Sequence, residues 1–299
     1  MSLFDEEEPP EYDCASFRAI NALRTALIPT SKNNDVWVED PSPILAPQFW
    51  PSTLSELDDG VGGFYGLSAI TGEPGCGKSL LGCASGIEAA SSGKWQVVHF
   101  FAENDVDDIR ERFNRYVHHH TFTQAILANY HPVSTGFGQD KHSLCEEAVL
   151  QVDFQSDLPI LIIIDSINSI MNANPKVGYL SGMSDLLMWM AMARRDSRGE
   201  CSFLMTAEAN QRGNAKGESV GFLADVDLRV APTKGSKDVV AFNLQKTRRT
   251  ASIDMGLYLR QNELGDFRCQ SDFNQPAREE YDFDKDVIDL ASRRANCGE

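Results

Sequence analysis

Short apolar runs alternate with longer amphipathic segments along the chain from residue 64 onward. Runs of about four to eight residues rich in Val, Ile and Phe are typical of buried strands, whereas segments with apolar residues three and four positions apart are typical of helices. The pattern predicts strands at 64–71, 95–102, 158–165, 201–207, 225–231, 238–247 and 253–261, and helices at 78–92, 106–120 and 185–197.

The order of these segments predicts an α/β fold. Strands that alternate with helices form a mainly parallel, twisted sheet with helices on its faces. The last three predicted strands follow one another without helices, so we expect an antiparallel portion at the end of the sheet. Before the core, an amphipathic segment at 14–28 ends at Pro29 and predicts a short helix, which packs either on this core or on a neighbouring subunit.

A glycine-rich segment between the first predicted strand and the first predicted helix has a pattern that binds phosphate. Glycines let such a loop curl until its backbone N–H groups point at phosphate oxygens, and the helix N-terminus adds partial positive charge. We expect Lys78 to reach the β- and γ-phosphates of ATP, and Ser79 to offer its hydroxyl to Mg²⁺. The segment matches GxxxxGK[ST] in full and is followed by Leu80: Gly72, Glu73, Pro74, Gly75, Cys76, Gly77, Lys78 and Ser79.

Two acidic residues at strand ends complete the expected site. The apolar run of the third predicted strand ends in Asp165, as expected for a carboxylate that holds Mg²⁺ beside a P-loop. Glu103 follows the second predicted strand, at the carboxyl edge where open parallel sheets bind ligands. We interpret Glu103 as the catalytic base that orients or deprotonates water, although Asn104 and Asp105 beside it also fit a simple turn.

Composition adds constraints on compartment and partners. The seven cysteines include no CxxC pair, so they indicate a reducing cytoplasm and no structural metal site. No apolar run is long enough to span a bilayer, so we expect no membrane contact. The net charge of −17 cannot attract DNA as a whole, so any contact with nucleic acid must come from local basic loops or from a ring of subunits.

Acidic residues concentrate at both ends of the chain. Residues 1–13 hold six acids and no base, and residues 266–299 hold nine acids and five bases. Such composition is typical of solvated tails. We divide the chain into a mobile acidic tail at 1–13, an N-terminal helix and linker at 14–50, an ATPase core at 51–265 and an acidic C-terminal tail at 266–299.

The P-loop, Glu103 and Asp165, in this order and spacing, resemble the RecA-like ATPase superfamily, which includes RecA, RadA, KaiC, DnaB-type helicases and RepA-type helicases. The resemblance covers about residues 50–262. It implies one RecA-like core, with a mainly parallel sheet flanked by helices and with late antiparallel strands. It also implies ATP hydrolysis with Mg²⁺ by a homo-oligomeric ring or filament.

Two segments resemble the pair of loops that hold single-stranded DNA in RecA proteins. The first is the stretch INSIMNANPKVGYLSGMSD directly after Asp165-Ser166, and the second follows the sensor strand within CSFLMTAEANQRGNAKGES. Basic residues among glycines suit backbone phosphates, which need charge and conformational freedom. A solvated surface loop is the alternative interpretation. The resemblance implies a DNA surface at Lys176 in the first loop and at Arg212, Asn214 and Lys216 in the second.

Two further positions take their expected roles from the resemblance. Relatives commonly have a glutamine at the end of the sensor strand, where it senses the γ-phosphate, but this chain has Glu208 there. The coupling between phosphate and loop therefore departs from the family pattern, and we expect Asn210 to do part of this sensing.

The stretch FNLQKTRRT resembles the Lys-x-Arg element that RadA, KaiC and DnaB relatives insert into the site of a neighbouring subunit. By this resemblance, Lys246 and Arg248 stabilise the γ-phosphate charge in trans, with Arg249 as a competing candidate. A basic strand end on the surface is the alternative. If the element acts in trans, an isolated monomer is a poor ATPase.

Two functions follow from these observations. The first is an oligomeric ATPase that acts on single-stranded DNA in recombination, repair or replication, as a recombinase or a helicase; the two basic loops favour it. The second is a KaiC-like switch whose ATP state controls a protein partner without binding DNA; the net acidity and Glu208 favour it. A small-molecule kinase, a third class, leaves the Lys-x-Arg element and the second loop unexplained.

Overall fold

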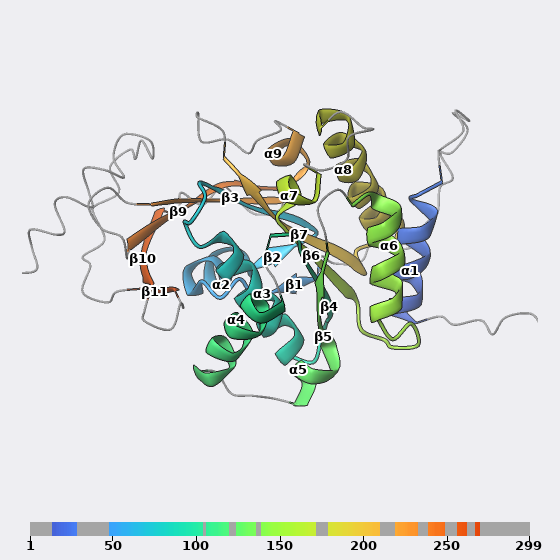
Figure 1. Cartoon of the computed structure of the whole chain (residues 1–299), viewed down its shortest axis with the longest axis horizontal. Coiled ribbons are helices and arrows are strands. Elements are labelled where there is room, and N and C mark those ends of the chain that lie inside the picture. Colours follow the sequence, from blue (N-terminus) through green and yellow to red (C-terminus); the bar gives the residue numbers. More distant parts are fainter. Residues whose placement is uncertain are drawn as a thin grey trace, which may run out of the picture.

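A nine-stranded mixed sheet forms the centre of the molecule (Figure 1). The strand order is β11-β10-β9-β8-β3-β7-β6-β4-β5. This computed structural model describes residues 14–28, 48–103, 106–119, 124–135, 139–171, 179–209, 219–232, 239–248, 256–261 and 267–269.

The strands of the sheet divide into a parallel part and an antiparallel part, as the sequence pattern predicts. Neighbouring strands in the part from β8 to β5 run parallel, whereas each later strand runs antiparallel to its neighbour. The parallel strands are β3 (Leu67–Gly72), β4 (Gln96–Phe101), β5 (Tyr130–Ser134), β6 (Ile160–Asp165), β7 (Cys201–Glu208) and β8 (Val226–Pro232). The antiparallel strands are β9 (Val239–Thr247), β10 (Gly256–Gln261) and β11 (Phe267–Cys269). The predicted α/β class, with late antiparallel strands, is therefore confirmed.

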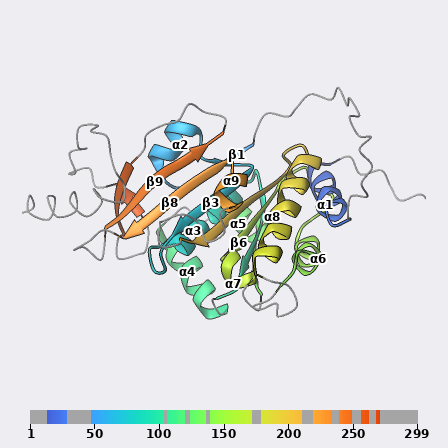
Figure 2. The same cartoon turned by 90° about the horizontal axis from the view of Figure 1, so that it is seen from above.

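Helices cover both faces of the sheet, and Figure 2 shows the two layers from above. One face packs against α1 (Ala15–Thr25), α6 (Lys141–Gln151), α7 (Ile167–Met171), α8 (Tyr179–Asp196) and α9 (Ser219–Leu223). The other packs against α2 (Ser55–Val61), α3 (Lys78–Ser91), α4 (Val106–His119), α5 (Gln124–Asn129) and a small antiparallel pair, β1 (Phe49–Trp50) and β2 (Phe64–Tyr65). No described helix has the length and apolar character required to cross a bilayer.

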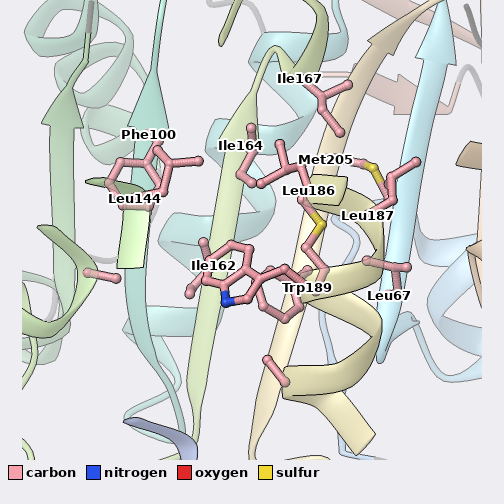
Figure 3. Packing of buried hydrophobic residues seen from close by; sticks show 14 of the residues in the cluster. Leu67, Phe100, Leu144, Ile162, Ile164, Ile167, Leu186, Leu187, Trp189 and Met205 are labelled. Carbon is pink, nitrogen blue, oxygen red and sulfur yellow. The ribbon is translucent and has the colours of Figure 1, made fainter. Parts of the chain in front are cut away.

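The core on the α8 face is continuous from the sheet to the N-terminal helix. Figure 3 shows Leu186, Leu187 and Trp189 of α8 packed against side chains of the sheet. The Trp189 indole meets the Phe203 ring edge-on at 5.7 Å, and its N–H donates to the Leu23 carbonyl of α1 at 3.0 Å. The helix α1 is therefore part of its own subunit's core, which decides between the two arrangements left open by the sequence.

The structure contains elements that the sequence pattern did not predict, namely α2, α5, α6, α7, α9, β1, β5 and β11, and α7 and the start of α8 lie in the stretch after Asp165-Ser166 that the resemblance interprets as the first loop. Helix α8 begins at Tyr179, before the predicted range 185–197, and β5 was not predicted. Because β5 is an edge strand with only its first residue buried, it lacks the apolar run that identifies a central strand. At the other edge, β11 continues the sheet beyond the core boundary that we placed at residue 265.

Two glycines of helix α3 face the sheet, and the helix approaches it most closely at Gly86. A Cβ built on Gly86 lies 2.6 Å from Ile163 Cδ1 and 3.2 Å from the Tyr130 ring, whereas one built on Gly82 meets only Thr206 Cγ2, at 3.5 Å. The 2.6 Å distance at Gly86 is a steric clash, whereas the 3.5 Å distance at Gly82 is an ordinary contact. Gly86 thus has no room for a larger side chain, whereas Gly82 has room for a Cβ.

We expect Gly86→Ala to destabilise the fold by roughly 1–2 kcal/mol through overpacking, although alanine is the better helix former. Gly82→Ala is the matched control and should leave stability unchanged or raise it by up to about 1 kcal/mol, because its Cβ finds space. Urea unfolding of both variants measures the difference. Equal stability of the two variants would contradict the role given to Gly86.

Candidate functional site

Four parallel strands bring the predicted site residues to one edge of the sheet. In the strand registers, Gly72 at the end of β3 lies opposite Glu208 of β7, and Asp165 at the end of β6 lies opposite Phe101 of β4. Glu103 follows β4 by two residues. Because the carboxyl ends of parallel strands meet at the same edge, the P-loop and both predicted acids share one face of the molecule.

The glycine-rich segment forms a turn that leads directly into α3. Gly75 and Gly77 have φ angles of 78° and 89°, values that glycine adopts without strain. A Cβ on Gly75 would meet nothing within 4 Å, so the loop is open on its outer side. The Lys78 ammonium donates to the carbonyls of Gly72 and Glu73, at 3.0 and 2.7 Å. The lysine is therefore folded inside the loop that the sequence expects to hold phosphate.

Asp165 connects the loop to the centre of the sheet. Its Oδ1 accepts from the Ser79 hydroxyl at 2.9 Å and from the Thr206 hydroxyl at 2.5 Å, while its Oδ2 makes no hydrogen bond within the described part of the chain. The side chain is only 2% exposed. Burial raises the pKa of this carboxyl, and the two hydroxyls and the Arg112 guanidinium partly offset that increase. The peptide bond that follows it, Asp165–Ser166, is cis.

These contacts fit an Mg²⁺ ion. A hard cation prefers oxygen ligands, and Ser79 and Asp165 present a hydroxyl and a carboxylate from two different elements. The buried Oδ2 without a hydrogen bond is a free acceptor beside that pair. The pair that the sequence predicts to hold the metal is thus assembled by the fold.

Sequence reasoning missed two residues that contact Asp165. Arg112 of α4 places its Nη1 4.0 Å from Asp165 Oδ2, and Thr206 lies on β7 between β3 and β6. Thr206 carried one sequence signal, a polar residue inside the apolar run Phe203–Ala207. Arg112 carried only its place on the helix after Glu103, which does not specify where its side chain goes.

Glu103 is held at the edge of the site by two serines. The hydroxyls of Ser166 and Ser169 both donate to Glu103 Oε1, the first at 3.0 Å. Both serines are buried, whereas Glu103 is exposed. The two buried serines therefore orient the carboxylate, which remains exposed to solvent. A base that acts on water needs both properties.

Glu208, the residue predicted to sense phosphate, lies between the P-loop strand and Asp165. Its backbone N–H donates to the Asn168 side chain of α7 at 2.7 Å, and the next residue, Ala209, donates to the Gly72 carbonyl at 2.9 Å. This end of β7 is therefore tied both to the P-loop and to α7. Six other predicted residues lie outside the described part of the chain: Lys176, Asn210, Arg212, Asn214, Lys216 and Arg249.

Lys246 and Arg248 lie at the opposite end of the sheet from the P-loop. The Arg248 N–H donates to the Asp225 carbonyl at 3.0 Å, and the Asp225 N–H donates to the carbonyl of Leu67, the first residue of β3. Gly72 is five residues further along that strand, about 17 Å at 3.3 Å per residue. Arg248 cannot reach the P-loop of its own subunit.

Lys246 makes contacts within its own subunit. Its Nζ donates to the Gly221 carbonyl of α9 at 2.8 Å, and its strand position pairs with Asp227. Burial raises the pKa of Asp227 to about 6, although Thr71 donates to it and the two cations Lys246 and Arg229 are nearby. Burial lowers the pKa of Lys246. Within the Lys-x-Arg element, Lys246 thus bonds to its own subunit through its side chain, whereas the bond to Asp225 described for Arg248 is made by its backbone.

Comparison with models of known protein families and with curated protein sequences finds no match to this chain.

A buried carboxylate kept for function should weaken the fold. Because the folded-state pKa of Asp165 lies above its ordinary value, Asp165 favours folding below that value, and this contribution is lost as pH rises through the folded-state pKa. We expect Asp165→Asn, which keeps both hydroxyl donors satisfied, to gain stability relative to the parent protein as pH rises. Urea unfolding without nucleotide between about pH 4 and 8 measures the trend.

Asp140→Asn is the control with the opposite sign. Asp140 caps α6 and accepts from the Ser143 N–H at 2.9 Å, which lowers the pKa of Asp140. Its contribution to folding is present above its ordinary pKa and is lost on acidification, so Asp140→Asn should lose stability relative to the parent as pH rises. If both variants followed the same trend, the account of Asp165 would be wrong.

Proposed function

We propose that the chain is an oligomeric RecA-like ATPase that couples ATP binding and hydrolysis to action on single-stranded DNA. The observation that carries the ATPase part is the contact between Ser79 and Asp165 at the P-loop, with Glu103 on the adjacent strand end. A phosphate loop, a buried carboxylate and an exposed carboxylate then share one edge of a parallel sheet. The predicted order of motifs supports the RecA-like assignment.

In this proposal the P-loop residues bind the nucleotide. Mg²⁺, when bound, neutralises the charge that develops on the phosphate oxygens. Lys78 exchanges its two loop carbonyls for phosphate oxygens, so its ammonium is already placed and desolvated. Ser79 and Asp165 hold the metal, and Thr206 fixes the carboxylate that does so. Arg112 supplies a positive charge beside Asp165 from α4.

Glu103 is the proposed base. Its Oε1 is fixed by Ser166 and Ser169, which leaves the second carboxylate oxygen to accept a proton from water. Because the two serines both donate to the carboxylate, they keep it in one orientation. The base is thus positioned by the same turn that follows Asp165.

The position of Arg248 supports assembly. Arg248 lies at the end of the sheet opposite to the P-loop of its own subunit. An arginine that cannot reach its own P-loop can serve only the site of a neighbour. Head-to-tail stacking of subunits brings these two ends together. The proposal assigns the trans role to Arg248 and leaves Lys246 as the residue that anchors β9 to α9.

The connection to DNA depends on the two loops predicted to bind it. They begin after α7 and after β7, and the bond between Asn168 and the Glu208 N–H ties these starting points together. The bond from the Ala209 N–H to the Gly72 carbonyl ties the second of them to the P-loop. A change at the phosphates thus has a short physical path to both loops, as coupling between ATP and DNA bound at these loops requires.

ATP hydrolysis tests the first half of the proposal. We expect Lys78→Ala to abolish hydrolysis and Glu103→Gln to lower kcat by roughly 10²–10⁴ while ATP binding persists. Single-stranded DNA should raise the rate several-fold and should shift in electrophoretic mobility with the protein and a non-hydrolysable ATP analogue. Hydrolysis and nucleotide-dependent assembly without any effect of DNA would reject DNA as the effector and favour the protein switch.

Mixed oligomers test the trans role. Arg248→Ala should lower kcat by roughly 10³–10⁵, the range for trans arginines. Arg248→Ala subunits keep an intact nucleotide site but lack the arginine. Lys78→Ala subunits keep the arginine but lack a working nucleotide site. Mixing equal amounts of the two inactive variants, after subunit exchange, should restore about one quarter of the parent rate in a head-to-tail assembly, since half the sites are intact and half of those meet an intact finger. No recovery would exclude action across the interface.

A further inference from the structure

The geometry points to Tyr65 as the residue that positions Arg248 for its action on the neighbouring subunit. This inference rests on the proposed trans role of Arg248, and it concerns how a side chain at the end of a strand is held still. Tyr65 has no place in the nucleotide site, since it lies in β2 at the start of the P-loop strand.

The phenol hydroxyl of Tyr65 lies where β9 ends. It accepts from the Arg248 N–H at 3.0 Å and lies 3.1 Å from the Thr247 hydroxyl. The Arg248 N–H is also directed at the Asp225 carbonyl, at 3.0 Å, so it is shared between two acceptors. The backbone nitrogen of Arg248 is therefore hydrogen-bonded to the core of its own subunit.

The Tyr65 ring itself cannot move easily. It is fully buried, and the Phe49 ring meets it edge-on at 5.0 Å. Its own strand pairs with β1, and Gly66 after it has a φ of 62°, with a Cβ-sized space already filled by Asp225 and Arg194. The hydroxyl is thus carried by a rigid support.

Rigidity at this point matters for a residue that acts across an interface. A displacement of about 1 Å at a catalytic group can cost about 100-fold in rate, and functional groups need support from hydrogen bonds behind them. Arg248 follows the last residue of its strand, so the ladder to β8 restrains it less than the residues before it. The Tyr65 hydroxyl adds a second restraint on the Arg248 N–H beside that of the Asp225 carbonyl.

Tyr65→Phe removes this restraint together with the contacts of the same hydroxyl with Thr247, at 3.1 Å, and with the Asp225 carbonyl, at 3.5 Å. The ring still fills its site, and the Arg248 N–H keeps the Asp225 carbonyl as its acceptor. We expect kcat for ATP hydrolysis by the assembled full-length chain to fall by between about 10- and 100-fold, with KM for ATP and the mass by light scattering unchanged. In an Arg248→Ala background, Tyr65→Phe should cause no further loss.

Mixing separates a positioning role from a structural one. Tyr65→Phe subunits should regain activity when mixed with Lys78→Ala subunits, because their sites then receive a well-positioned arginine from the neighbour. Ser16→Ala is the matched control: it also loses a buried hydroxyl bonded to backbone carbonyls, on α1, and should keep the parent kcat.

Three results would overturn the assignment of Tyr65: an additive loss in the Arg248→Ala background, no recovery on mixing, or an altered mass. These differ from failure of the proposed function. If Arg248→Ala subunits also fail to recover with Lys78→Ala subunits, the trans mechanism itself is wrong. If they recover and Tyr65→Phe subunits do not, only the role of Tyr65 is rejected.

Discussion

The buried carboxylate of Asp165 is the constraint on which the site depends. An acid at the end of a fully buried strand loses its hydration, and the fold offsets that loss with two hydroxyl donors and a nearby guanidinium. Those partners come from α3, β7 and α4, so one carboxylate determines how closely three elements approach the end of β6. Gly86 on the inner face of α3 makes that approach sterically feasible.

Local pattern was enough to predict the parts of the molecule that are themselves local. The glycine spacing of the P-loop and the apolar run before Asp165 are each encoded in a few adjacent residues, and the central strands are recognisable because both of their faces are buried. The edge strand β5 was not recognised because it lacks such a run, and the start of α8 was missed within a segment containing Ser181 and Gly182, residues with weak helix propensity.

The remainder depends on contacts between distant segments. Nothing near Thr206 or Arg112 in the sequence indicates that both meet Asp165, because their approach is determined by strand order and by the angle of α4. The same holds for Arg248. Its separation from the P-loop follows from the antiparallel pairing of β9 with β8, which returns the chain to the amino end of β3. A resemblance at FNLQKTRRT suggests the role, whereas topology supplies the reason that Arg248 cannot reach the P-loop of its own chain.

Placing the phosphate loop and Arg248 at opposite ends of one sheet gives each subunit a direction. With the proposed trans contact, every junction between subunits completes one catalytic centre, so an open chain always has one more subunit than it has complete centres. Closing the chain into a ring removes that deficit. A short open assembly therefore wastes a large share of its capacity, and activity per subunit rises with length before it levels off. The arrangement of strands would thus make the rate a measure of assembly size.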